Sequence, residues 1–218
     1  MIIPTSYTGI YVNTRSEVPA IAETYKSEAE DALDIINSGP SGRALLDKIA
    51  KLSSSKDRKV TLKELEINSK PYSLPVLTSW QLDKYNPSSF RENTEIAKGL
   101  AVQGVFTKGE GASAIIGWAP DIASVRLNQN GSPTGVGTGR DDKITSLAHE
   151  LVHVRHILSG SSMAWQGDRY DPSSRAGKEE SRAVGIGNYR YSKTGKPSEN
   201  SIRAEHNLPL RSKYKPHE

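Results

Sequence analysis

Apolar residues recur at helical spacing in several stretches of the chain, the longest being residues 18–37. There the apolar positions follow one another every three to four residues, which is typical of an amphipathic helix with one buried face. The segment 38–42, Ser-Gly-Pro-Ser-Gly, is expected to end that helix. Further helices are predicted over 43–52, over about sixteen residues ending before Gly160, from 173 or 174 to 184, and from 197 to 207.

Alternating apolar and polar residues predict strands in the middle of the chain. The clearest is 59–67, in which Val60, Leu62, Leu65 and Ile67 are the apolar positions. Further strands are predicted over 100–107, 112–118 and 122–127, with a turn over 108–111. Residues 68–92 are expected to form an irregular polar stretch with Trp80 as a packing anchor, and residues 128–139 a loop.

This order of elements, with helices first, mixed strands next, and a long helix followed by further helices, is typical of an α+β fold. A length of 218 residues suits one domain. We expect residues 17–218 to form that compact domain, with a small mixed sheet beside the long central helix. We expect residues 1–16, which are rich in Ser, Thr, Tyr and Asn, to be disordered.

Composition excludes several classes of function. The chain has no cysteine, which excludes disulfides, thiolate zinc ligands and cysteine nucleophiles. The net charge is +4, but the basic residues are dispersed, so we expect no nucleic-acid partner. No apolar stretch approaches the roughly 18 residues that a membrane span needs, so we expect no membrane partner. We expect the protein to be a monomer.

Residues 149–153 read His-Glu-Leu-Val-His, in a chain with only five histidines. Histidines at i and i+4 project from one helical face and can hold one zinc ion. The glutamate after the first histidine then lies beside the activated water as general base. His149 and His153 are therefore candidate zinc ligands, and Glu150 is the candidate base. His156, three residues later, is expected to pack on the helix or to orient a ligand.

A catalytic zinc site uses three protein ligands and leaves one position open. The pattern with a third histidine six residues after the second is excluded, because Ser159 stands there. A carboxylate from the helix expected over 173–184 is the other option, and Glu179 and Glu180 provide one. Adjacent glutamates are also common on a solvated helix face. Asp168, Asp171 and Glu199 are the fallback candidates.

Two segments carry a resemblance to a known family. The segment 149–160 resembles the zinc helix of the clostridial neurotoxin light chains, which also has a histidine seven residues after the first and ends in glycine. The segment 179–185, Glu-Glu-Ser-Arg-Ala-Val-Gly, resembles their Glu-Glu-x-Arg-x-x-Gly, in which the second glutamate binds zinc. The resemblance implies a zincin-like metalloprotease domain with Zn²⁺ held by His149, His153 and Glu180, with Glu179 as the alternative third ligand.

The C-terminal part carries a third match. Arg211-Ser-Lys-Tyr214 resembles the Arg-x-x-Tyr of the same light chains, a pair that stabilises the tetrahedral intermediate, which implies that Arg211 and Tyr214 are catalytic. In length and in the segment 208–214 the chain is more similar to the small type III secreted effector zinc metalloproteases, the NleD-like group of enteric and plant pathogens. Its first acidic residue is Glu17, and residues 1–16 resemble the secretion region of type III effectors from plant-associated bacteria.

These resemblances imply a zinc endopeptidase secreted by a type III system into the host cell cytoplasm. Its substrate would be a host signalling protein, with MAP kinases as the substrates that the group suggests. We expect the host protein to bind as an extended peptide along the strand at 112–118 or 122–127, by β-augmentation. The alternatives are an intracellular zinc peptidase that is no effector, and a non-catalytic binding protein with a fortuitous motif.

Overall fold

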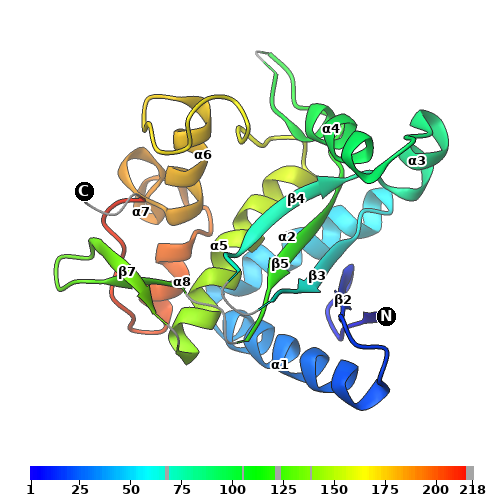
Figure 1. Cartoon of the computed structure of the whole chain (residues 1–218). Helices are drawn as coiled ribbons and strands as arrows, with labels where there is room; N and C mark the ends of the chain where they lie inside the picture. Colours follow the sequence, from blue (N-terminus) through cyan, green and yellow to red (C-terminus); the bar gives the residue numbers. More distant parts are fainter. Residues whose placement is uncertain (67–68, 105, 121–123, 138, 215–218) are drawn as a thin grey trace.

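A five-stranded mixed sheet forms one layer of the protein (Figure 1). The computed structural model describes residues 1–66, 69–104, 106–120, 124–137 and 139–214. The strand order is β1-β2-β3-β5-β4, and β2, β3 and β5 are parallel while β1 and β4 run antiparallel at the two ends. The strands are β1 (Ile2–Pro4), β2 (Ile10–Asn13), β3 (Val60–Glu64), β4 (Tyr72–Val76) and β5 (Ser113–Trp118).

Helices pack against this sheet and surround one central helix, α5 (Arg140–Leu158). Apolar residues that are fully buried lie on more than one side of α5, because it contacts β4 and β5 on one side and α1, α2, α6 and α8 on others. The other helices are α1 (Pro19–Ser38), α2 (Pro40–Lys56), α3 (Ser79–Tyr85), α4 (Phe90–Ala101), α6 (Arg175–Val184), the 3-10 helix η1 (Gly187–Tyr189), α7 (Tyr191–Thr194) and α8 (Glu199–Glu205). A separate hairpin pairs β6 (Ser124–Leu127) with β7 (Pro133–Gly137).

The end of α5 is set by Gly160. This residue has a φ of +65°, a conformation that favours glycine, directly after the C-cap Ser159. A Cβ at this position would lie 2.0 Å from the carbonyl oxygen of Gly109, so the close approach of the two chain segments also requires glycine. The predicted stop of the long helix is therefore correct. None of the helices in the described residues is long and apolar enough to cross a bilayer.

The expected disorder of residues 1–16 is wrong. β2 pairs in parallel register with β3, and Ile10 and Val12 are buried in the core. The pairing of β2 with β1 and β3, together with these buried side chains, holds the segment in the sheet. The N-terminal segment is therefore part of the domain, and its role in secretion stays a prediction.

Four middle assignments also need correction. The predicted irregular stretch 68–92 contains β4 and α3, and the predicted loop 128–139 contains β7. Residues 100–101 end the amphipathic α4 instead of opening a strand, because Thr94, Ala97 and Ala101 share its buried face. The predicted anchor Trp80 is 45% exposed, with the Lys84 ammonium 5.2 Å from its ring. Positions 67–68, 105, 121–123 and 138 of the predicted elements lie outside the described residues.

Candidate metal centre and catalytic cleft

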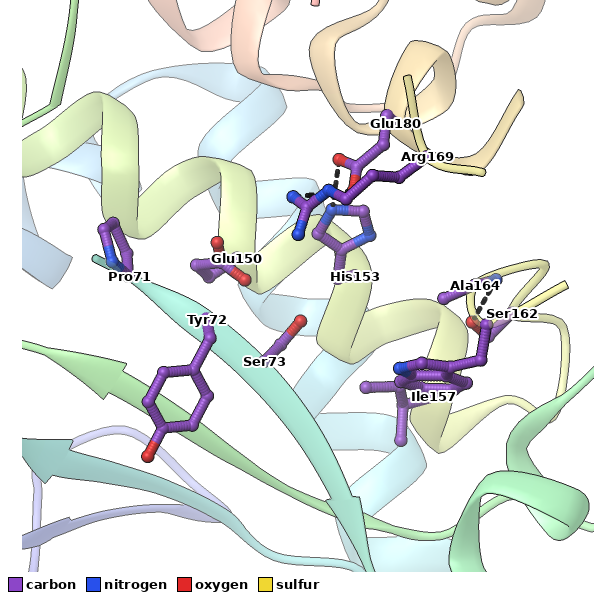
Figure 2. Close-up of a pocket in the computed structure, with 11 residues that line it drawn as sticks. Pro71, Tyr72, Ser73, Glu150, His153, Ile157, Ser162, Ala164, Arg169 and Glu180 are labelled. Carbon is purple, nitrogen blue, oxygen red and sulfur yellow. Dashed lines mark hydrogen bonds and ion pairs between the residues drawn. The ribbon is translucent and has the colours of Figure 1, made fainter. Parts of the chain in front are cut away.

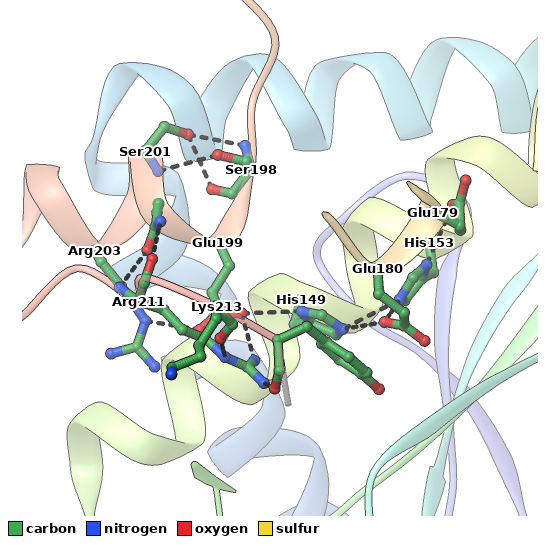
Figure 3. Close-up of polar contacts among 12 residues, drawn as sticks. His149, His153, Glu179, Glu180, Ser198, Glu199, Ser201, Arg203, Arg211 and Lys213 are labelled. Carbon is green, nitrogen blue, oxygen red and sulfur yellow. Dashed lines mark hydrogen bonds and ion pairs between the residues drawn. The ribbon is translucent and has the colours of Figure 1, made fainter. Parts of the chain in front are cut away.

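Helices α5 and α6 bring three candidate ligands together. His149 and His153 lie one helical turn apart on α5, and Glu180 faces them from α6. The His149 Nε2 and His153 Nε2 atoms are 3.1 Å apart, and Glu180 Oε2 lies 3.2 Å and 3.1 Å from them. All three side chains are buried. Lone pairs from two imidazoles and a carboxylate therefore converge on one point, as Figure 3 shows.

The size of this triangle fits a zinc ion. Zinc binds nitrogen and oxygen at about 2.0–2.2 Å, which separates tetrahedral ligands by roughly 3.3 Å. The three observed distances between donor atoms, 3.1 to 3.2 Å, are within a few tenths of an ångström of that value. Two histidines and one glutamate are also a ligand set of catalytic zinc sites. The residues present therefore fit this metal.

Glu179, next to Glu180, binds the Nδ1 atoms of two histidines and is not one of the three converging ligands. It is 1% exposed, and its Oε1 accepts hydrogen bonds from His153 Nδ1 at 3.2 Å and His156 Nδ1 at 2.6 Å. Its Oε2 accepts from Arg182 Nη1 at 2.9 Å and from a backbone N–H at 3.2 Å. Glu179 thus holds the proton of His153 on Nδ1 and leaves Nε2 free as a ligand.

His149 is held in the same way by Glu199 of α8. Its Nδ1 donates to Glu199 Oε2 at 2.9 Å, and the same oxygen accepts from Arg211 Nη1 at 3.2 Å. Glu199 Oε1 accepts from Arg203 Nε at 2.7 Å (Figure 3). Both histidines therefore keep Nε2 turned toward Glu180, because a buried carboxylate on each side fixes the tautomer.

The electrostatics keep these carboxylates ionised. Burial alone would raise the pKa of Glu180, but the two histidines outweigh it and lower this pKa. Burial is likewise outweighed at Glu199, whose pKa is lowered by Arg211, His149 and Arg203. The pKa of His156 falls to about 4, chiefly through burial, with Glu179 opposing. A neutral His156 donates from Nδ1 to Glu179 and accepts at Nε2 from Arg155 Nη2 at 2.6 Å.

A cavity of about 90 Å³ opens beside the ligands (Figure 2). Glu150, His153 and Glu180 line one part of it, and Pro71, Tyr72 and Ser73 at the start of β4 line another. Glu150 is 7% exposed and belongs to the same helix as both histidines. The predicted base therefore borders the same cavity as two of the ligands.

The structure brings the two residues of the predicted Arg-x-x-Tyr pair together, with the Arg211 guanidinium 5.0 Å from the Tyr214 ring centroid. The Tyr214 ring stacks on the His149 ring, with centroids 6.1 Å apart and planes 13° from parallel. Burial, helped by Glu180, raises the pKa of the Tyr214 hydroxyl, which keeps its proton. The Arg211 guanidinium is buried and also binds Glu199, Lys213 O and the Tyr214 carbonyl. Tyr214 thus lies against a candidate ligand, His149, and Arg211 holds Tyr214 there through its ring and its carbonyl.

The fallback ligands lie elsewhere. Asp168 and Asp171 accept hydrogen bonds from Tyr170 N and Ser173 in the turns before α6. Glu199 orients His149 and does not join the triangle. Sequence reasoning missed Arg169, whose Nη2 lies 2.9 Å from Glu180 Oε1. Its segment has no periodicity, so no pattern points to this residue.

Comparison with known proteins agrees with this geometry. The sequence matches the profile of the "Effector protein" family of peptidases, M91, over residues 14–214. No curated protein matches in sequence. The structure is similar to the catalytic domain of Clostridium botulinum neurotoxin serotype F, with a TM-score of 0.52 and 13% identity. The botulinum neurotoxin type G light chain gives a TM-score of 0.45 and 16% identity.

The alignments cover 91% of this chain but only 58% of the serotype F domain and 55% of the type G light chain. This chain thus spans less than two thirds of those domains. The shared fold with the serotype F domain confirms the predicted α+β class, and the family match confirms the resemblance to effector metalloproteases. Because the family profile matches most of the sequence, the chain belongs to the M91 peptidase family of effector proteins.

Proposed function

We propose that this protein is a zinc-dependent endopeptidase, with His149, His153 and Glu180 as the metal ligands and Glu150 as the base. One observation carries the proposal. Three ligand atoms converge within 4.8 Å of one another, and Glu150 borders the same cavity. A helix that carried the motif by chance would not require Glu179 and Glu199 to orient both imidazoles.

The roles of the residues follow from their positions. Zinc, when bound, polarises a scissile carbonyl and makes water a better nucleophile near neutral pH. Glu150 takes the proton of the attacking water and passes it to the leaving amine. Tyr214, protonated and stacked on His149, donates a hydrogen bond from its hydroxyl to the developing oxyanion and keeps its proton. Arg211 assists by holding the Tyr214 main chain through its carbonyl.

The substrate would be an extended peptide of a host protein, bound along β4. The predicted use of the strand at 112–118 is wrong, because β5 lies between β3 and β4. The strand at 122–127 lies in a hairpin outside this sheet, as far as it is described. β4 ends the strand order of the described sheet, and its first residues line the cavity of Glu150. A peptide added to that edge would pass Tyr72 and Ser73 and reach the ligands.

Membership of an effector family supports delivery into a host cell. We propose secretion by a type III system and action in the host cytoplasm, on a signalling protein such as a MAP kinase. N-terminal proteomics of host lysate treated with wild type and with Glu150→Ala tests this part. New N-termini that appear only with the wild type identify the substrate. Their absence in lysate, with purified peptides still cleaved, would favour an intracellular peptidase of another kind.

Metal removal tests the enzymatic core of the proposal. Dialysis against a strong chelator should abolish peptide hydrolysis, and one equivalent of zinc should restore it. His149→Ala should bind no stoichiometric zinc and should be inactive, because two ligands do not form a stable site. His206→Ala is the matched control, since His206 is the C-cap of α8 and lies outside the ligand cluster. Full activity of chelated protein would contradict the proposal.

A further inference from the structure

One guanidinium joins three separate parts of the molecule at the metal centre. Arg169 lies in the irregular segment before α6, and its Nη2 is 2.9 Å from Glu180 Oε1. The same Nη2 donates a hydrogen bond to the Tyr214 hydroxyl. The guanidinium also lies 5.3 Å from the Tyr214 ring centroid and 5.8 Å from that of Tyr170. Arg169 therefore contacts a candidate ligand and the C-terminal segment at once.

The two oxygens of Glu180 have separate partners. Oε2 faces His149 and His153, whereas Oε1 binds Arg169. Figure 2 shows Glu180 between His153 and Arg169. A charge-assisted hydrogen bond to one carboxylate oxygen restricts rotation of the whole group. Arg169 thus keeps Oε2 pointed at the two imidazoles and engages the other oxygen.

Tyr214 is placed by two stacking contacts and by this hydrogen bond. Its ring stacks on His149 and, at 5.9 Å and 27°, on Tyr170. Stacking sets the plane of the ring but leaves it free to slide within that plane. The hydrogen bond from Arg169 fixes the position of the Tyr214 hydroxyl within that plane. Because the hydroxyl oxygen accepts this bond, the hydroxyl proton stays available to donate.

A second anchor keeps the C-terminal segment attached without Arg169. Arg211 binds Glu199 and the carbonyls of Lys213 and Tyr214, and its backbone pairs with Asn200. Arg169 itself is half exposed, with 54% of its side-chain surface accessible. Removing Arg169 should therefore release the hydroxyl of Tyr214 and loosen the segment locally, while the fold and the attachment of the segment through Arg211 are kept.

We propose that Arg169 is a positioning residue that couples the third ligand, Glu180, to the hydroxyl of Tyr214 in the closed C-terminal segment. Only the expected changes in kcat and KM rest on the proposed function. Metal affinity and the protection of residues 208–214 are expected to depend on Arg169 even if the substrate chemistry is different.

A double-mutant cycle tests the coupling. Arg169→Ala should lower kcat by about 10–100-fold with KM changed less than about 3-fold, because a small misplacement of a catalytic group costs up to about 10². Tyr214→Phe should have a similar effect. If Arg169 acts through the hydroxyl, the kcat of the double variant should lie within about 3-fold of the kcat of the less active single variant. Arg169→Lys should recover part of the loss, since it keeps the charge without the planar fork.

Two readouts do not need activity. Arg169→Ala should weaken zinc binding by about 10-fold in competition with a chelator, since loss of a partner of a ligand typically costs 10–100-fold. Hydrogen exchange of residues 208–214 should be faster in zinc-loaded Arg169→Ala than in the wild type. Arg91→Ala, which removes an exposed arginine from α4, should change none of these quantities.

Several results would overturn the inference. Losses in kcat that multiply in the double variant would mean that Arg169 and Tyr214 act independently. A rise in KM alone would make Arg169 a substrate-binding residue. Unchanged zinc affinity together with unchanged exchange of residues 208–214 would remove the coupling itself. If the wild type cleaves no peptide, the proposed function fails, and these last two measurements still decide the inference.

Discussion

Glu199→Ala should destabilise the protein and weaken its metal site at once. Glu199 is 2% exposed and accepts hydrogen bonds from His149, Arg203 and Arg211 at 2.9, 2.7 and 3.2 Å. Removing one partner of a buried ion pair costs about 3–5 kcal/mol, because the remaining charges stay buried and uncompensated. We expect the free energy of unfolding of the metal-free protein to fall by that amount.

The effect on the metal is a separate quantity. Without Glu199, nothing described at His149 Nδ1 fixes the tautomer that leaves Nε2 free. Loss of such a partner typically lowers metal affinity by 10–100-fold, or about 1.4–2.7 kcal/mol. Urea denaturation measures the first quantity, and zinc competition with a chelator on the folded variant measures the second.

Glu205→Ala is the matched control on the same helix. Glu205 accepts from the Ser41 and Gly42 backbone N–H groups at 2.6 and 3.4 Å, and so caps the start of α2. Its loss should cost about 0.5–2 kcal/mol, as for other helix caps, and should leave zinc affinity unchanged. The reasoning is refuted if Glu199→Ala binds zinc as tightly as the wild type, or if both variants weaken it equally.

Three further predictions follow from the site and the fold. Glu180→Ala should lose stoichiometric zinc, whereas Glu179→Ala should keep zinc with reduced affinity, because Glu179 only orients His153. Metal analysis after gel filtration measures both. Loss of zinc in Glu179→Ala but not in Glu180→Ala would make Glu179 the ligand. Arg211→Ala should lower both kcat and stability, because its guanidinium is buried against Glu199, whereas Tyr214→Phe should lower kcat about 10–100-fold with an unchanged melting temperature; kinetics and thermal unfolding separate the two. Trp80→Ala should change the free energy of unfolding by less than about 1 kcal/mol in urea denaturation, because its side chain is exposed, and a cost above about 3 kcal/mol would show that Trp80 packs in the core after all.

The part of the site that lies on one helix can be predicted from the sequence. His149, Glu150 and His153 belong to one helix, so their spacing alone places both imidazoles on one face. The helix also has clear ends, with Gly160 as the residue that stops it. Glu180 lies on another helix, where the need for a third ligand indicates a carboxylate at 179 or 180, and only the resemblance to the neurotoxin light chains favours Glu180 over Glu179.

Long-range partners could not be predicted in this way. Glu199 reaches His149 across a sequence separation of 50, and its neighbours in the chain carry no pattern that indicates a metal centre. Arg169 lies in a segment without periodicity, where burial and contacts depend on the folded chain. The prediction that 112–118 is an edge strand is wrong for the same reason. Alternation indicates that 112–118 is a strand, but its place between β3 and β4 follows from pairing with distant residues.

The short elements were missed because their local patterns are weak. β1 has only three residues, β2 lies in a polar N-terminal segment, and β4 contains Pro75 within a Pro- and Ser-rich stretch, so none of them shows a clear alternation. Each is stabilised by neighbouring strands and helices rather than by its own propensity. In residues 1–16, the buried side chains of Ile10 and Val12 and the pairing of β2 with the distant β3 join a polar segment to the sheet.

The most direct test measures zinc content and peptide hydrolysis in one preparation of Glu150→Ala. Glu150 borders the cavity but stands outside the triangle of His149, His153 and Glu180. The variant should therefore keep about one zinc per chain while its kcat falls by at least ~10², because the base that activates water is gone. A variant that loses its zinc, or that keeps more than about a hundredth of the wild-type kcat, would contradict the assignment of Glu150 as the base of a zinc endopeptidase.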